Sequence, residues 1–221
     1  MIIIGLTGSV GTGKSETCNF FKRNRVSVFD SDNEVKLLYK KKIIISKIKE
    51  KFPEAFTGNI LVKEKLAKIV FEDTIKLRAL EKIIYRYLRK KKNLWIRRKI
   101  RENKKVVVFD VPLLFEKDAA DKYDKIILVT CSEDIQKKRV LNRKGWNEKR
   151  LILTKKQQLV DIKKKRLADI VINTDRGKRY VSNKITKLLK KSFIAKKKIN
   201  NKILNNFNDK KNSLRYRNYR T

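Results

Sequence analysis

Residues 2–15 read IIIGLTGSVGTGKS, and this stretch decides the fold. The apolar run Ile2–Leu6 is short and rich in β-branched residues, which is typical of a strand buried on both faces of a parallel sheet. Residues Gly8–Ser15 match the pattern GxxxxGK[ST], in which glycines let backbone N–H groups close around phosphate just before a helix. The stretch therefore predicts a central first strand, a phosphate-binding loop and a helix that starts at Lys14.

Four further apolar runs predict strands, and helical patterns separate most of them. The runs are 26–29, 106–110, 126–130 and 170–173. Between about Asn33 and Arg101 we expect helices without strands, with a turn at 57–59, and a last helix at about 179–191. This alternation predicts an α/β fold of three layers, like that of P-loop nucleoside triphosphate hydrolases, with a five-stranded parallel sheet between helices. The helical stretch 33–101 is expected to be a substrate-binding insertion.

The composition excludes several kinds of chemistry. Histidine is absent, so no imidazole can act as base or bind zinc, and the proton acceptor must be a carboxylate. Two cysteines are too few for a disulfide framework, which fits a reducing, cytoplasmic location with buried thiols. No apolar run reaches the length of a membrane span and no leader pattern is present, so we expect no membrane association and no processing.

The formal charge of +37 and the isoelectric point near 10.3 favour contact with polyanions. The basic residues are dispersed and not interleaved with aromatic residues on one element, so we expect weak polyanion binding but no specific nucleic-acid partner. Residues 192–221 carry nine Lys or Arg against one Asp and predict a mobile basic tail. The chain is expected to be a monomer or a small homo-oligomer.

The phosphate-binding loop predicts ATP and Mg²⁺ as cofactors. Lys14 is expected to reach the β- and γ-phosphates, and the Ser15 hydroxyl to bind the metal. Without a ligand, Lys14 would be an unpaired cation at the unfavourable end of a helix. Asp110 ends an apolar strand in the manner of a Walker B segment and is expected to hold Mg²⁺ through water.

Two aspartates follow the predicted second strand, which we expect beside the first. Of Asp30 and Asp32, one could accept the proton of the acceptor hydroxyl or orient that hydroxyl, and the other could support the metal or the loop. The alternative is that Asp32 caps a helix that begins near Asn33. Arg139 and Arg143 lie four apart on the helix expected after Ser132 and should project from one face of it, where they could clamp the transferring phosphoryl group or form a merely solvated face.

Together these motifs resemble the dephospho-CoA kinase family over about residues 1–191. The resemblance rests on the segments 6–8 (LTG), 28–32 (VFDSD), 111–116 (VPLLFE), 136–139 (QKKR) and 168–173 (ADIVIN), and on Arg143, Gln158 and Lys164. The chain departs from the family pattern at Glu16, where Thr is usual, and at Tyr85-Arg86, where His-Pro is usual.

The resemblance implies an ATP-dependent kinase that phosphorylates the ribose 3′-hydroxyl of dephospho-CoA to give coenzyme A and ADP. It implies Asp32 as catalytic base with Lys14 and Arg139, and a lid at about 139–158 formed mainly by 139–150. The implied ATP-binding residues are Gly8, Gly11, Thr12, Gly13, Lys14, Ser15, Glu16 and Arg143, and the implied acceptor-binding residues are Asp30, Asp32, Pro112 and Leu113.

Two other functions stay open on the sequence alone. A nucleoside or nucleotide kinase of the same fold is possible because the loop specifies phosphate and says nothing of the acceptor. A basic P-loop protein that binds RNA or the ribosome is suggested by the charge and by residues 215–220, which read RYRNYR. A GTPase is disfavoured, because the chain has no Asn-Lys-x-Asp segment.

Overall fold

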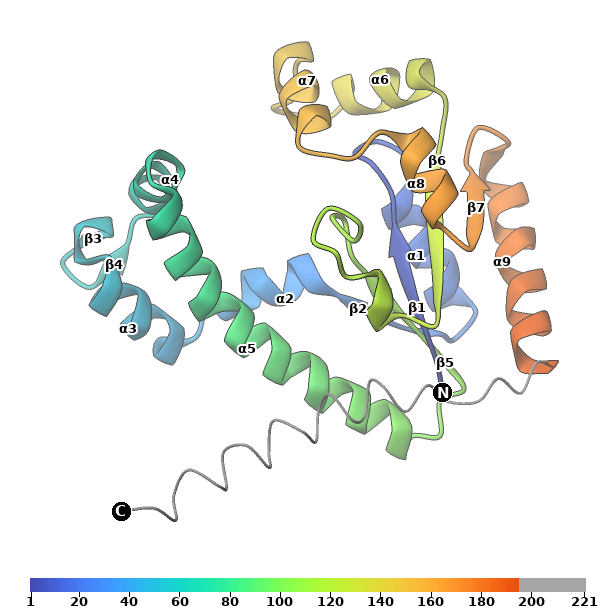
Figure 1. Ribbon diagram of the computed structural model, residues 1–221, viewed down its shortest axis with the longest axis horizontal. Coiled ribbons are helices and arrows are strands. Elements are labelled where there is room, and N and C mark those ends of the chain that lie inside the picture. The colour runs from blue at the N-terminus through green and yellow to red at the C-terminus, as the bar shows by residue number, and fades with distance from the viewer. Residues whose placement is uncertain (195–221) are drawn as a thin grey trace. The chain divides into compact units, whose positions relative to one another are not determined.

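The computed structural model describes the backbone of residues 1–194 and the side chains of residues 1–190. Within it the chain forms two compact units, one built from Met1–Val28 with the chain from Lys104 onward, the other from Phe29–Asn103 (Figure 1). The first unit is α/β and the second is mainly helical. Residues 195–221, most of the expected basic tail, lie outside the described residues.

The sheet has five strands in the order β2-β5-β1-β6-β7. These are β1 (Ile2–Thr7), β2 (Ser27–Asp30), β5 (Val106–Asp110), β6 (Lys125–Thr130) and β7 (Ile170–Asn173). Strand β1 pairs in parallel with β5 and with β6, and β6 pairs in parallel with β7. All five predicted strands are present and the first is central, which confirms the predicted sheet. The expectation that the second strand lies beside the first was wrong, because β5 lies between them.

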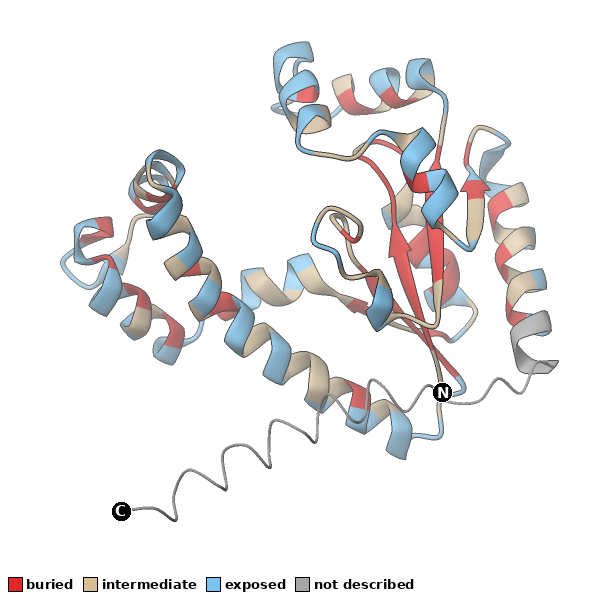
Figure 2. Cartoon of the chain, viewed as in Figure 1, coloured by how far each residue is buried: buried red, intermediate tan, exposed pale blue. Residues whose placement is uncertain are grey.

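Helices α1 and α9 cover one face of this sheet. In the first unit the helices are α1 (Lys14–Arg23), α6 (Glu133–Leu141), α7 (Glu148–Lys156), α8 (Asp161–Leu167), α9 (Gly177–Ile194) and the short 3₁₀ helix η2 (Ala120–Lys122). Alternate strand residues such as Leu6 and Ile127 pack against Phe21 of α1 and Ile185 of α9 in one buried cluster. Neighbouring strand residues such as Val107 point to the opposite face and are also buried (Figure 2), as expected for strands that are apolar throughout.

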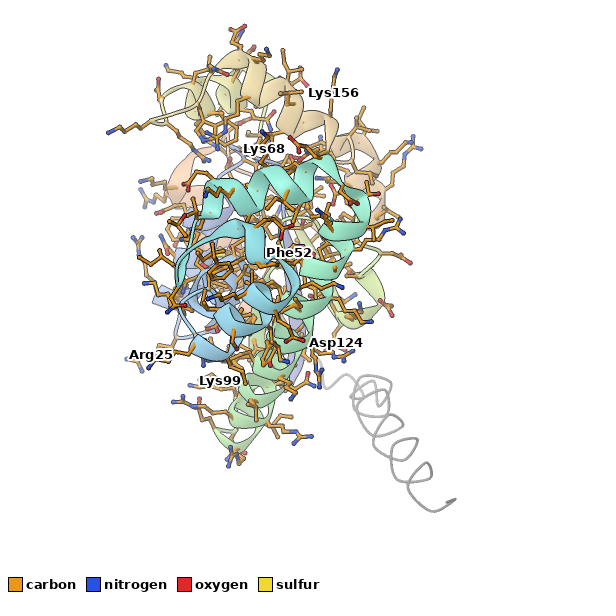
Figure 3. The ribbon with its side chains drawn as sticks, turned by 90° about the vertical axis from the view of Figure 1, so that its left-hand side faces the viewer. Arg25, Phe52, Lys68, Lys99, Asp124 and Lys156 are labelled. Atoms are coloured by element: carbon orange, nitrogen blue, oxygen red, sulfur yellow. The ribbon has the colours of Figure 1, made fainter. Side chains whose placement is uncertain are left out.

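The helical unit has a core of its own. It comprises α2 (Ser31–Leu38), α3 (Lys42–Lys51), the 3₁₀ helix η1 (Pro53–Ala55), β3 (Phe56–Thr57), β4 (Ile60–Leu61), α4 (Lys63–Glu72) and α5 (Thr74–Arg101). Ile44, Ile48 and Phe52 are buried within this core (Figure 3, Phe52 labelled). Lysine side chains such as Lys68 of α4 extend from its surface, so the charge excess is solvated.

The expectation of helices without strands between Asn33 and Arg101 was wrong. Strands β3 and β4 pair in an antiparallel hairpin of two residues each, too short to give a recognisable alternation of polar and apolar residues. The predicted turn at 57–59 joins them, and Gly58 has a φ of +60° there. In the described part of the chain, no helix combines the length and the apolar character needed to cross a bilayer.

Candidate active site

The segment from Gly8 to Ser15 leads from the end of β1 through a loop into the first turn of α1, as the sequence predicts. Gly11 and Gly13 have φ values of +79° and +91°, a region that side chains rarely allow. A Cβ atom on Gly11 would also lie 2.6 Å from Cγ2 of Val140. Gly13 is the N-cap of α1 and has no side chain to cap it, so the first-turn N–H groups can bind an anion at the positive end of the helix dipole.

Lys14 is already paired in this structure. Its ammonium group forms an ion pair with the carboxylate of Asp110, and the two side chains are only 14% and 12% exposed. The contact arises because β1 and β5 are neighbouring parallel strands, with Leu6 opposite Asp110, so both chain segments end at the same edge of the sheet. The expectation that Lys14 would be unpaired without a ligand was therefore wrong.

The oxygen donors near Lys14 suit magnesium. Among the described residues, no three acidic or thiol side chains gather to form a metal cluster. Ser15 is exposed at the first turn of α1, and Asp110 ends β5. A hydroxyl and a carboxylate fit Mg²⁺, which takes hard oxygen ligands and fills most of its shell with phosphate oxygens and water.

Asp30 and Asp32 lie at the end of β2 and at the start of α2, in the helical unit. Asp30 is the N-cap: its Oδ1 accepts a hydrogen bond from the backbone N–H of Asn33 at 2.9 Å. The alternative that Asp32 caps a helix beginning near Asn33 was wrong, because α2 begins at Ser31. Asp32 is exposed in the first turn, where the helix dipole favours negative charge.

The two arginines differ in position. Arg139 lies on α6, and its guanidinium donates to Oγ1 of Thr174 at 2.7 Å. The Thr174 hydroxyl in turn donates to the carbonyl oxygen of Thr12 at 2.8 Å, which connects Arg139 to the phosphate loop. Arg143 lies beyond the end of α6 and is exposed, so the expectation that both project from one helix face was wrong.

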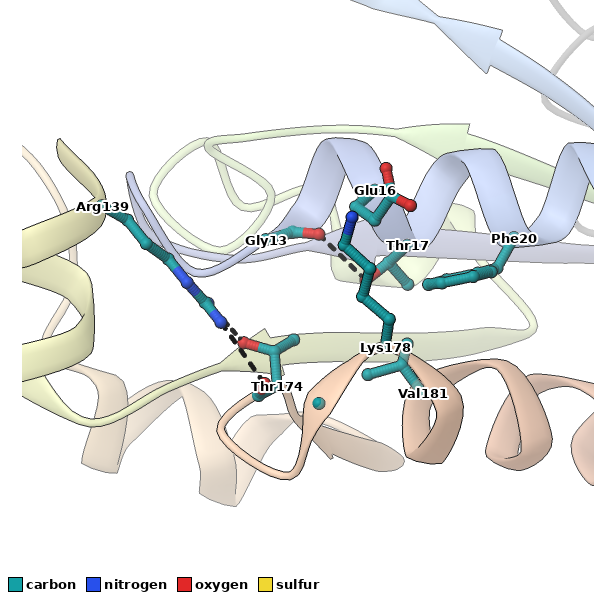
Figure 4. A pocket seen from close by; sticks show the side chains of 9 residues that line it. Gly13, Glu16, Thr17, Phe20, Arg139, Thr174, Lys178 and Val181 are labelled. Carbon is teal, nitrogen blue, oxygen red and sulfur yellow. Dashed lines mark hydrogen bonds between the residues drawn. The ribbon is translucent and has the colours of Figure 1, made fainter. Parts of the chain in front are cut away.

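A pocket of about 200 Å³ opens beside the phosphate loop (Figure 4). Residues from the phosphate loop, α1, α6, α9 and the segment between β7 and α9 line it, among them Gly13, Glu16, Phe20, Arg139, Thr174 and Lys178. Its volume is below the roughly 300 Å³ at which pockets for a drug-sized ligand begin, so it fits only a part of a nucleotide. An aromatic ring, two cations and a threonine make it suitable for a base or a sugar next to phosphate.

A family model described as dephospho-CoA kinase matches residues 2–179 of the chain, which include the phosphate loop, both aspartates of the 28–32 segment and the whole sheet. The chain belongs to the dephospho-CoA kinase family.

Individual relatives agree with this assignment to the dephospho-CoA kinase family. The dephospho-CoA kinase of Bartonella quintana is 42% identical over 174 residues, which are 79% of this chain and 89% of the relative. The dephospho-CoA kinase of Bartonella henselae is 37% identical over the same shares of both chains. The chain is therefore a kinase, and the interpretation as a P-loop protein that only binds RNA is set aside.

Solved structures support the fold. A crystal structure of a Thermus thermophilus protein superposes with a TM-score of 0.75 at 28% identity and covers 85% of this chain and 95% of that one. The dephospho-CoA kinase of Campylobacter jejuni gives a TM-score of 0.61 at 22% identity over the same shares, which is evidence for the fold alone.

Sequence reasoning gave no role to several residues that hold the phosphate loop in this dephospho-CoA kinase family member. The side-chain amide of Gln136 donates to the carbonyl oxygen of Val10 at 2.6 Å, and the N–H of Val10 donates to Oε1 of Gln158 at 3.2 Å. Both glutamines lie in segments that carry the family resemblance, which was the available signal. Thr174 and Lys178 gave no signal in the sequence.

The two thiols are poorly reactive by their surroundings. Burial raises the pKa of Cys131 to about 11, and its Sγ lies 3.9 Å from the carbonyl oxygen of Gly11. Burial, followed by the charge of Asp110, raises the pKa of Cys18 still further. Both shifts lower the fraction of reactive thiolate near neutral pH.

We expect slow modification of the native thiols. At pH 8 a thiol reagent should modify Cys131 about a hundredfold more slowly than it modifies the unfolded chain, because the thiolate fraction falls about tenfold for each unit by which the pKa rises. Cys18 should react only on unfolding. Ellman's reagent with and without denaturant measures both rates. Equal rates in the two conditions would contradict this assignment.

Proposed function

We propose that this chain transfers the γ-phosphoryl group of ATP to the ribose 3′-hydroxyl of dephospho-CoA, giving coenzyme A and ADP in the last step of coenzyme A biosynthesis. The observation that carries the proposal is the position of the Lys14 ammonium, which pairs with Asp110 where the glycine-rich loop meets the N-terminus of α1, an end without a side-chain cap. Such a loop binds phosphate, and the family of the chain supplies the acceptor.

On binding ATP, Lys14 exchanges the carboxylate of Asp110 for the β- and γ-phosphates. The N–H groups between Gly11 and Glu16 surround the phosphate chain, and the adjoining pocket takes the base or the ribose. Arg139 lines that pocket and is well placed to contact ATP, which supports its proposed part in phosphoryl transfer. Arg143 follows α6 by two residues within the proposed lid, residues 139–158, and would reach ATP when this lid closes.

Ser15 and Asp110 would hold Mg²⁺, the serine directly and the aspartate through water once Lys14 has left it. Bound there, the metal would neutralise charge on the β- and γ-phosphates. Without nucleotide, Asp110 and Lys14 thus pair with each other. With nucleotide bound, Asp110 would face the metal and Lys14 the phosphates.

Asp32 is the proposed base for the acceptor hydroxyl, and Asp30, Pro112 and Leu113 are proposed to bind the acceptor. Pro112 lies two residues after the end of β5, and its carbonyl oxygen accepts a hydrogen bond from the Thr7 hydroxyl at 3.2 Å. It therefore lies at the edge of the sheet where parallel folds bind ligands. The helical unit, residues 29–103, is proposed to receive the pantetheine arm of the acceptor.

The direct test incubates the full chain with ATP, Mg²⁺ and dephospho-CoA and follows the product by mass spectrometry. Coenzyme A and ADP should form in equal amounts, and omission of Mg²⁺ should abolish both. An analogue of dephospho-CoA that lacks the 3′-hydroxyl should stay unmodified. Faster phosphorylation of a free nucleoside or nucleotide than of dephospho-CoA would contradict the proposed acceptor.

A further inference from the structure

One lysine of this chain is buried completely. Lys164 lies on α8 with no exposed surface, and among residues 1–190 it is the only lysine or arginine classed as buried. A charged ammonium group loses its hydration in such a place, and the loss is tolerable only if protein groups replace the water. The partners of Lys164 therefore indicate what the charge does there.

Lys164 joins three segments that are far apart in the sequence. Its Nζ lies 2.9 Å from Oε1 of Glu116, in the segment after β5, and donates to Oγ of Ser9 at 3.2 Å, in the phosphate loop. The other carboxylate oxygen, Oε2, is buried without a hydrogen-bond partner among the described residues. Lys164 is thus the counter-ion of Glu116 and at the same time a hydrogen-bond donor to Ser9 of the phosphate loop.

The hydroxyl of Ser9 is fixed in one orientation by α8. It accepts a hydrogen bond from Lys164 and donates one to Oδ1 of Asp161 at 2.6 Å. Asp161 and Lys164 are the first and fourth residues of the helix and lie on the same side of it. Because its proton is donated to Asp161 and one lone pair accepts from Lys164, the Ser9 hydroxyl cannot rotate freely.

The same contacts reach the end of the proposed lid. The backbone N–H of Leu159 donates to Oε1 of Glu116 at 2.8 Å, the same oxygen that binds Lys164. One residue earlier, Gln158 accepts a hydrogen bond from the N–H of Val10. Residues Gln158, Asp161 and Lys164, at and after the end of the lid, therefore hydrogen-bond to Ser9 and Val10. We call Ser9 and Val10 the outer part of the phosphate loop.

We propose that Lys164 is a positioning residue that keeps the outer part of the phosphate loop in the shape that receives the triphosphate, acting through Ser9 and Glu116. It is a positioning and not a catalytic residue, because its side chain is fully buried and contacts Ser9 and Glu116, not Lys14 or Ser15. The inference rests on the proposed function only in so far as the loop binds ATP. Its test measures ATP binding directly, without the acceptor, so that a wrong acceptor assignment does not affect it.

The first variant is Ser9→Ala, which leaves the ion pair between Lys164 and Glu116 in place. We expect its Kd for ATP to rise about tenfold, the size expected for loss of a hydrogen bond to a charged group, and its Tm to fall less than that of Lys164→Met, because the ion pair remains. Calorimetric titration with ATP and thermal unfolding give the two values. An unchanged Kd would overturn the proposal, because it would show that the orientation of the hydroxyl does not matter for the loop.

The second variant separates positioning from stability. Lys164→Met leaves Glu116 buried without a cation and should lower Tm, whereas Lys164→Met combined with Glu116→Gln should recover much of Tm and still bind ATP about tenfold more weakly, by the same reasoning. Recovery of both Tm and ATP affinity in the double variant would overturn the proposal in favour of a purely structural lysine.

Two further variants complete the design. Lys163→Met removes an exposed lysine from the same helix and should change neither Tm nor ATP affinity. Adding Ser9→Ala to Lys164→Met should weaken ATP binding no further than Lys164→Met alone, because residues that act through one contact are not additive. Fully additive losses would show that the two residues act independently and would count against the proposal.

Discussion

Replacing Lys14 with Met should lower kcat/KM by roughly 10²- to 10³-fold, the loss typical of removing one group that stabilises charge in the transition state. Negative charge spreads over the oxygens of the γ-phosphoryl group as it moves, and the Lys14 ammonium is proposed to lie against them. Met has a similar length and no charge, so the change removes the electrostatic interaction and little packing. Steady-state kinetics with varied ATP measure the effect.

The ion pair between Lys14 and Asp110 gives Lys14 a part in stability as well as its proposed part in catalysis. Lys14 is also the counter-ion of Asp110, so Lys14→Met leaves a largely buried carboxylate without a cation and should lower Tm as well. Lys14→Met combined with Asp110→Asn should restore much of Tm but not kcat/KM.

Lys22→Met serves as the matched control for Lys14. It removes an exposed lysine of the same helix and should leave both Tm and kcat/KM unchanged. Turnover near the wild-type value in folded Lys14→Met would contradict the proposed role of Lys14.

Asp32→Asn is the second large expected loss. General base catalysis typically contributes about 10²- to 10⁴-fold, so kcat should fall by that order while the Kd for ATP stays close to the wild-type value. The chain has no histidine that could replace the carboxylate. Asn has nearly the same shape as Asp and cannot accept the proton. Helix α2 should persist, because its N-cap is Asp30.

Two controls make the Asp32 experiment specific. Asp134→Asn changes an exposed aspartate at the second position of α6, the position that Asp32 holds in α2, and should leave kcat unchanged. Asp30→Asn keeps the N-cap, since Asn caps helices as well as Asp does. If Asp30→Asn abolishes turnover while Asp32→Asn does not, the roles of the two aspartates are reversed.

Local patterns were sufficient for the elements of the sheet. Strands β1, β5 and β6 are apolar for most of their length because they are buried on both faces, and all five strands lie within a residue or two of their predicted positions. The hairpin of β3 and β4 was missed because a strand of two residues is too short to show an alternation of polar and apolar residues. Arg143 was misplaced because α6 ends at Leu141, and helix ends are weakly marked in sequence.

The sequence by itself determined the phosphate loop, the helix behind it and the family, because the glycines, Lys14 and Ser15 are contiguous in the chain and are brought together by the loop and helix turn that they form. Only the tertiary structure decided which side chains meet. The pair of Lys14 with Asp110 joins residues 96 positions apart, and the contact of Lys164 with Ser9 joins residues 155 apart. Such contacts depend on strand order and on the place of α8 against the loop, and these follow from the packing of the whole α/β unit.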